Sequence, residues 1–171
     1  MNPFCGCHAD LKNESKSFIY EHHVLFNKDK TTIISYRAKE ANYVIPNSVT
    51  SIGACAFLEC NSLTSIIIPD SVTSIGEWAF YGCKSLTSIN ISNNVISIGS
   101  NAFEGCISLK SINIPDSVTS IGDNAFRECD FLSPQVKSDI IQRFGEDVFY
   151  GEDDWFIRID PDFFIDKLRF F

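Results

Sequence analysis

A unit of 23 residues repeats four times along this chain without an insertion. Successive copies begin at Ile45, Ile68, Ile91 and Ile114. A fixed period of this length indicates a solenoid, in which each unit buries its apolar face only by stacking on the next. The repeat therefore predicts an array of four 23-residue units over residues 45–132.

Reading down the columns of the repeat assigns a physical role to most positions. β-branched residues recur where short strands would face inward. A glycine follows in each copy, and we expect a sharp bend there, with positive φ as one reason for it. An Ala-Phe pair comes next, whose ring would fill the centre of the coil before a short helical turn. The glycines are Gly53, Gly76, Gly99 and Gly122, and the phenylalanines are Phe57, Phe80, Phe103 and Phe126.

Cysteine also recurs once per copy. Equivalent positions in stacked coils lie about 4.8 Å apart, so the first and last thiols would be roughly 14 Å apart, too far to share one zinc ion. Parallel side chains also disfavour the dihedral angle of a disulfide. We therefore expect buried free thiols that pack as small apolar residues. The four positions are Cys60, Cys83, Cys106 and Cys129.

Two segments precede the array. Residues 1–17 are expected to be a mobile N-terminus, in which Cys5, Cys7 and His8 could contribute to a metal site or be incidental. Because a closed zinc site needs four ligands, no metal and no cofactor is predicted. Residues 18–44 are predicted to form a β-hairpin cap, with strands over 18–26 and 31–36, that covers the open end and the unpaired strand edge of the first coil.

Two further segments follow the array. Residues 133–151 are predicted to contain a C-terminal capping helix, with Ser133 as N-cap, Pro134 at the first position and Gly145 as C-cap. Residues 152–171 form an acidic and aromatic tail that either folds back on the cap or presents an apolar surface to a partner or to a second copy. The tail's binding candidates are Trp155, Phe163, Phe164, Phe170 and Phe171.

Composition excludes several classes of function. The formal net charge of −8 leaves no basic face for nucleic acid. The sequence has no run of eighteen apolar residues and no signal peptide, so we expect a cytoplasmic protein or, alternatively, a fragment of a cell-surface protein. All 3 histidines precede residue 24. Since neither a nucleophile elbow nor a phosphate loop accompanies them, an enzyme is not expected.

The repeat closely resembles that of the BspA-like leucine-rich repeats, found mostly in bacterial and some protist proteins. The copies "IPDSVTSIGEWAFYGCKSLTSIN" and "IPNSVTSIGACAFLECNSLTSII" carry the resemblance. It implies a right-handed leucine-rich-repeat solenoid, β-rich with short helical turns, with a second sheet on the convex side and a binding function. The third copy departs from the pattern at Ser92, where the others have proline, and at Ile96, where the others have threonine.

The resemblance also implies that the strand closing each unit forms a concave sheet. Because side chains alternate between the two faces of a strand, every second residue would point outward. These small, uncharged side chains suit a surface that binds a protein or a glycan, and they suit an inert surface equally well. The alternative function is a structural element that self-associates, as a homodimer through the tail, or attaches to a larger protein. The outward candidates are Ser65, Ile67, Ser88, Asn90, Ser111 and Asn113, and the edge segment over 43–45 and the residue before it add Asn42 and Val44 to the same two columns.

Overall fold

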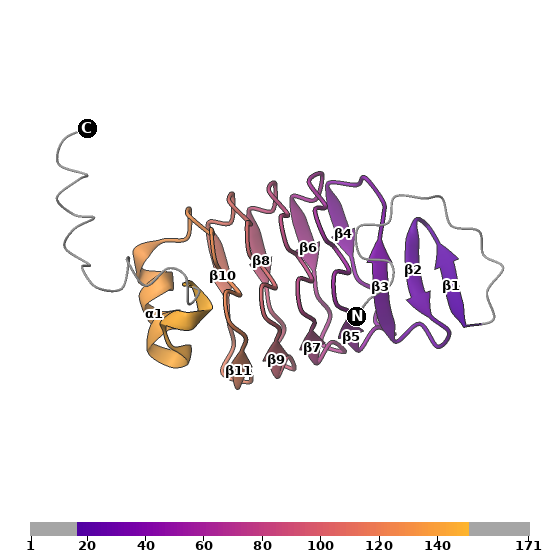
Figure 1. Cartoon of the computed structure of the whole chain (residues 1–171). Coiled ribbons are helices and arrows are strands. Elements are labelled where there is room, and N and C mark those ends of the chain that lie inside the picture. The colour runs from indigo at the N-terminus through magenta and orange to yellow at the C-terminus, as the bar shows by residue number, and fades with distance from the viewer. Residues whose placement is uncertain (1–16, 151–171) are drawn as a thin grey trace.

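The four 23-residue units form the coils of a β-solenoid of about four turns, as the period predicts. A computed structural model describes residues 17–150. Each coil adds short parallel strands to two sheets, which run along the array as two rows (Figure 1). Neighbouring strands pair at a distance of one repeat, with Ile66 opposite Ile89 and Ile89 opposite Ile112. The fixed period therefore becomes an in-register stack.

The strands have the following bounds. The seven-stranded sheet, called the convex sheet here, contains in spatial order β1 (Phe18–Glu21), β2 (Val24–Asn27), β3 (Thr32–Tyr36), β5 (Ser51–Ile52), β7 (Ser74–Ile75), β9 (Ser97–Ile98) and β11 (Ser120–Ile121). The four-stranded sheet, called the concave sheet, contains β10 (Ser111–Asn113), β8 (Ser88–Asn90), β6 (Ser65–Ile67) and β4 (Asn42–Val44).

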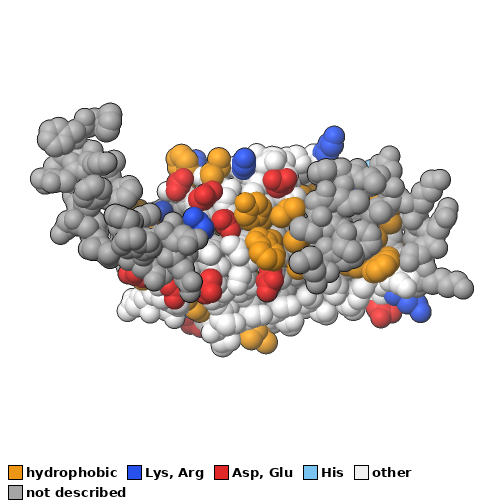
Figure 2. Space-filling view, viewed as in Figure 1, with side chains coloured by type: hydrophobic (Ala, Val, Ile, Leu, Met, Phe, Trp, Pro, Cys, Tyr) orange, Lys and Arg blue, Asp and Glu red, His pale blue; other side chains and the backbone are white. Residues whose placement is uncertain are grey.

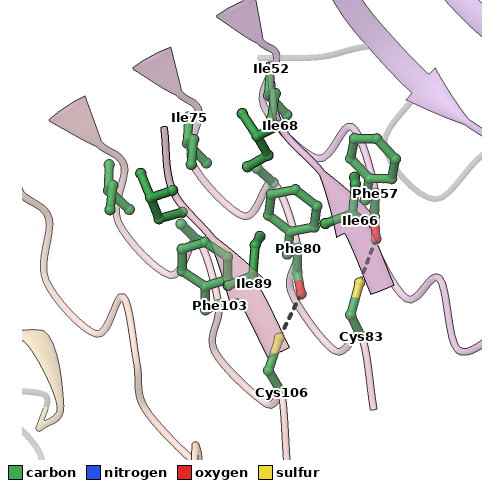
Figure 3. Packing of buried hydrophobic residues seen from close by; sticks show 14 of the residues in the cluster. Ile52, Phe57, Ile66, Ile68, Ile75, Phe80, Cys83, Ile89, Phe103 and Cys106 are labelled. Atoms are coloured by element: carbon green, nitrogen blue, oxygen red, sulfur yellow. Dashed lines mark hydrogen bonds between the residues drawn. The ribbon is translucent and has the colours of Figure 1, made fainter. Parts of the chain in front are cut away.

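The repeat phenylalanines form a stack along the axis of the array. The ring centroids of Phe57 and Phe80 lie 4.9 Å apart, and those of Phe80 and Phe103 lie 5.3 Å apart with an interplanar angle of 2°. All four rings are fully buried between the two sheets, and Figure 3 shows three of them among the isoleucines. Since the coil spacing repeats at each step, every ring meets the same environment as the last.

Aromatic residues outside the repeat extend this stack at both ends. The ring of Tyr36 lies 4.9 Å from that of Phe57, and the ring of Phe149 lies 5.7 Å from that of Phe126. The Tyr36 amide donates to the Ala56 carbonyl at 2.6 Å, and the Phe126 amide donates to the Val148 carbonyl at 2.8 Å. These bonds match the one from Phe57 to Ala79 inside the array. The end segments thus act as partial coils.

The glycine column is explained by close packing rather than by positive φ. A Cβ on Gly99 would lie 2.5 Å from the Glu77 amide nitrogen, and one on Gly76 would lie 2.7 Å from that of Ala54. Positive φ occurs two residues later, for example 52° at Trp78 and 57° at Asn101. The expectation of positive φ at the glycines is therefore wrong, because their place is set by the backbone of the preceding coil.

The segment between phenylalanine and cysteine is a series of turns, not the predicted helical turn. The Cys60 amide donates to the Phe57 carbonyl at 3.2 Å, and the Leu63 amide donates to the Cys60 carbonyl at 3.0 Å. A left-handed residue interrupts each turn series, such as Glu59 with φ 52° or Gly105 with φ 71°. These residues prevent a continuous right-handed helix.

The repeat cysteines are free thiols, as predicted, and three of the four are buried. Packing as small apolar groups is only part of their role, because each thiol also donates a hydrogen bond to the preceding coil. Cys83 Sγ lies 3.0 Å from the Phe57 carbonyl oxygen, and Cys106 Sγ lies 3.1 Å from that of Phe80 (Figure 3). The thiols therefore satisfy backbone carbonyls inside the core.

The N-terminal cap is a three-stranded meander rather than a single hairpin. His22 and His23 have φ of 50° and 60°, which forms a tight turn and divides the predicted strand over 18–26 into β1 and β2. β3 then pairs in parallel with β5, with Thr32 opposite Ser51. The meander extends the convex sheet, so the prediction that it covers the unpaired strand edge is wrong for the concave sheet, which ends at β4.

The C-terminal helix begins and ends where the sequence predicts. Helix α1 (Pro134–Phe144) is capped by Ser133, whose hydroxyl accepts from the Val136 amide at 3.3 Å, and ends at Gly145 with φ 90°. The helix buries Ile140 against the last coil. The 3-10 helix η1 (Glu146–Val148) follows and leads into Phe149.

Candidate binding surface

The concave sheet presents one row of side chains to the core and two rows outward. The central isoleucines of β6, β8 and β10 are buried, and the central residue of β4, Tyr43, is half-buried. The residues on either side of these four point away from the core. Of these outward residues, Ser65 is half-buried and the others are exposed. We call them the concave strip; it comprises Asn42, Val44, Ser65, Ile67, Ser88, Asn90, Ser111 and Asn113.

The concave strip changes in character along the array. Val44 and Ile67 lie opposite each other on the paired strands β4 and β6, and they are 63% and 60% exposed. In the next two coils the same row holds Asn90 and Asn113, whose side chains are joined by a hydrogen bond from Asn113 Nδ2 to Asn90 Oδ1 at 3.3 Å. The strip therefore has an apolar end and an amide end.

Polar side chains at the start of the strands form hydrogen bonds with the neighbouring strand of the sheet. Ser65 Oγ donates to Asn42 Oδ1 at 2.6 Å, and Thr64 Oγ1 donates to the Ala41 carbonyl at 2.8 Å. Thr87 Oγ1 donates to the Thr64 carbonyl one coil back at 3.3 Å. These bonds link successive coils and leave Val44 and Ile67 as the large side chains that reach outward.

The concave strip contains no ionisable side chain, and the ionisable groups with shifted pKa lie elsewhere. Burial raises the pKa of Tyr36 and Tyr43 to about 12, with Glu40 adding to the shift of both. Burial also raises the pKa of the Cys60 and Cys129 thiols to about 12. These four groups therefore stay protonated at neutral pH. On the face in Figure 2, acidic, basic and hydrophobic side chains of the described residues are interspersed.

Several predicted candidates lie outside the described residues. The aromatic tail candidates, Trp155, Phe163, Phe164, Phe170 and Phe171, belong to this group. So do Cys5, Cys7 and His8. Within residues 17–150, no three histidine, cysteine or acidic side chains come together as a metal site. Nor does any helix in that range have the length and apolar character to cross a membrane.

The structure exposes four large apolar residues that the sequence analysis did not include among its sites. Trp78 is 41% exposed, Ile96 53%, Ile107 39% and Phe131 64%. Comparing columns distinguishes all four. Phe131 stands where other copies have serine, Ile96 where they have threonine, Trp78 where two have asparagine, and Ile107 where they have polar or charged residues. They lie outside the concave strip.

Residues 34–154 match the family described as BspA type leucine rich repeat region, in six copies. The chain belongs to this family. The leucine-rich repeat family is commonly protein-binding or structural and is generally non-enzymatic. A search of curated proteins finds no match.

Solved structures of bacterial leucine-rich repeat proteins resemble this BspA-type chain. A protein of Bacteroides capillosus is 37% identical, with a TM-score of 0.62 over 68% of this chain and 95% of that one. The T. pallidum leucine rich repeat protein is 32% identical, with a TM-score of 0.59 over 71% of this chain and 58% of that one. A leucine rich cell surface protein of Faecalibacterium prausnitzii is 36% identical, with a TM-score of 0.61 over 71% of this chain and only 37% of that one.

Proposed function

We propose that this BspA-type repeat protein binds a partner protein through the concave strip. The observation that carries the proposal is the pair Val44 and Ile67, which are 63% and 60% exposed on adjacent strands. Neighbouring exposed apolar side chains suit an interaction site better than single ones do. Asn90 and Asn113 beside them supply hydrogen-bond donors and acceptors for a polar rim.

The character of the strip favours a protein over a glycan as the partner. Covering Val44 and Ile67 contributes favourably to the free energy of binding only when the partner's surface is apolar. A polyhydroxylated glycan offers little apolar surface. The four strands, spaced about 4.8 Å apart, make a sheet about 15 to 20 Å wide. Such a sheet supports an interface at the small end of the known range, so we expect weak or transient binding.

One substitution tests the proposal with a matched control. Ile67→Asn introduces the residue that the next coil carries at the same position, Asn90. Ile96→Thr is the control: it introduces the residue that the other coils carry at that position, and it removes an exposed isoleucine that lies outside the strip. Partners captured from extract by the wild type are purified, and their affinity for each variant is measured. We expect Ile67→Asn to weaken binding about tenfold and Ile96→Thr to leave it unchanged. Equal affinities for both variants would remove the strip from consideration.

A second candidate function is self-association, favoured by Phe131 at the last coil. Its ring is 64% exposed where earlier copies have serine. If this ring joins two copies, Phe131→Ser converts a dimer to a monomer in light scattering. Deleting residues 152–171 tests the tail as the dimer contact in the same way. A monomeric wild type at high concentration excludes both contacts.

We also propose that the chain is part of a cell-surface protein rather than a cytoplasmic one. Support comes from the similar Faecalibacterium prausnitzii structure, which is a cell surface protein and of which this chain spans 37%. Antibodies against the array should then label intact cells. Labelling that appears only after the cells are permeabilised would contradict the proposal.

A further inference from the structure

In the part of the chain that the structure describes, the concave sheet ends at β4 with an open edge, because β4 pairs only with β6. The meander β1 to β3 does not close this edge, because β3 pairs with β5 and continues the convex sheet. In Figure 1, β4 follows β10, β8 and β6, and the strand drawn next to it, β3, belongs to the convex sheet.

Among residues 17–150, the backbone groups on the outer side of β4 have no hydrogen-bond partner. Toward β6, the Ala41 carbonyl accepts from the Thr64 amide at 2.7 Å, and the Ile45 amide donates to the Ile67 carbonyl at 3.1 Å. Alternate residues of a strand face opposite neighbours, so Asn42 and Val44 direct their N–H and C=O groups away from β6. No hydrogen bond joins these backbone groups to another described residue.

The other end of the array differs. There, the Arg143 guanidinium of helix α1 donates to the Ile114 carbonyl at 2.7 Å and to the Pro115 carbonyl at 2.9 Å, just beyond β10. A cap therefore satisfies backbone acceptors at the C-terminal end. Strand β4, by contrast, carries no charged residue and no proline, the devices by which proteins block edge pairing.

We propose that an extended segment of a partner polypeptide adds to β4 as a fifth strand of the concave sheet. The outward N–H and C=O groups of Asn42 and Val44 are spaced as in any extended strand, so the backbone of another extended chain can pair with them. The segment would place an apolar residue beside Val44, continuing the row with Ile67, and a small polar residue beside Asn42. The inference does not rest on the function proposed above, since it requires the backbone edge and not the side chains of the strip.

A second copy of this chain is a poorer occupant of the edge. β4 has 3 residues, and pairing two such strands buries far less than the roughly 800 Å² per partner of a stable interface. A flexible segment of another protein, in contrast, needs only a short strand to dock beside β4.

A pair of peptides tests the proposal on the wild-type protein. The probe is a fluorescein-labelled peptide with the sequence of residues 85–92, because β8 already pairs in parallel with the next coil. In that pairing the Ile91 amide donates to the Asn113 carbonyl, so the amides of Ile89 and Ile91 in the peptide would face β4. N-methylation at these two positions removes the bonds, whereas N-methylation at Ser88 and Asn90 alters the opposite edge and serves as the control.

We expect the unmodified and control peptides to bind and to slow amide hydrogen exchange at Asn42 and Val44. The peptide methylated at Ile89 and Ile91 should bind about tenfold more weakly. On the protein side, Val44→Pro removes an outward amide at an edge that tolerates proline, and should reduce binding, while Val44→Thr and Ile67→Asn should retain it. Retention by Ile67→Asn separates this site from the concave strip.

Three results would overturn the inference. The two methylated peptides could bind equally, the exchange of Asn42 and Val44 could stay unchanged, or the free protein could be a dimer in which both amides are already protected. The last result would assign the edge to a second copy. If Val44→Pro lowers the melting temperature, its binding result is set aside. The affinities of the two methylated peptides for the wild-type protein then decide whether the inference holds.

Discussion

The thiol of Cys106 donates a hydrogen bond to the carbonyl oxygen of Phe80 in the preceding coil, across 3.1 Å. The same oxygen accepts the Cys83 amide of its own coil at 3.2 Å. A carbonyl oxygen has two lone pairs, and this arrangement uses both of them in the buried core. The cysteine column therefore links successive coils as well as filling space.

Cys106→Ala should lower the free energy of unfolding by about 1 to 2 kcal/mol, because it removes both the S–H donor and buried volume. Cys60→Ala is the matched control, since that thiol is half-buried and its hydrogen bond to the Tyr36 carbonyl is longer and therefore weaker, at 3.7 Å. Urea denaturation followed by circular dichroism measures both. Equal losses for the two variants would contradict a role for the hydrogen bond.

Alkaline pH should destabilise the fold. Burial raises the pKa of Cys60 and Cys129 from 9.0 to about 12, so the folded state holds these protons more tightly than the unfolded state does. Their contribution to stability is complete below about pH 9 and is lost as the pH rises toward 12. Tyr36 and Tyr43, raised from 10.0 to about 12, act in the same direction. The urea midpoint should therefore fall above about pH 9, and less steeply in Cys129→Ala; a midpoint that rises there would refute the argument.

Gly99→Ala should destabilise the array by about 3 kcal/mol, because the new Cβ would lie 2.5 Å from the backbone nitrogen of Glu77. Gly105→Ala provides the comparison. Its φ is 71°, but the nearest atom would be 3.5 Å from the Cβ, so the cost is the conformational strain of about 1 kcal/mol. Thermal unfolding should rank the Gly99 variant as the less stable; the reverse order would contradict the role of coil-to-coil contact.

Phe149→Ala should lower the free energy of unfolding by about 3 kcal/mol and loosen the last coil. The amides of Asn124 and Phe126 donate to the carbonyls of Asp147 and Val148, so their hydrogen exchange should accelerate in this variant. Phe144→Ala, at a half-buried position of helix α1, should leave that exchange unchanged. Equal acceleration in both variants would show that the helix, rather than the ring of Phe149, holds the coil.

The repeat could be predicted from the sequence because one local pattern recurs in one environment. The period sets the register, and strand alternation accounts for the exposure of Ile67 and the burial of Ile66. Capping chemistry likewise locates helix α1 between Ser133 and Gly145. Binding by the concave strip is still a proposal, since exposure follows from alternation but affinity does not.

The ends could not be predicted because they depend on contacts between coils. The turn at His22 and His23 lies in a run of strand-forming residues, and the histidines themselves do not signal positive φ. Phe149 follows Phe126 by one full repeat, but helix α1 replaces the intervening strands, so the residues between Leu132 and Phe149 do not match the repeat pattern. The open edge of β4 depends on the sheet order, which the spacing of the strands does not reveal.

The aromatic contacts at the two ends make the length of this molecule adjustable. Tyr36 and Phe149 offer the terminal coils an aromatic ring and the same type of backbone bond that a neighbouring repeat would offer. A duplicated or deleted 23-residue unit in the interior would therefore meet matching surfaces on both sides. Tandem duplication within a gene becomes a tolerated change, and each duplication would lengthen the concave sheet by one strand, or about 4.8 Å.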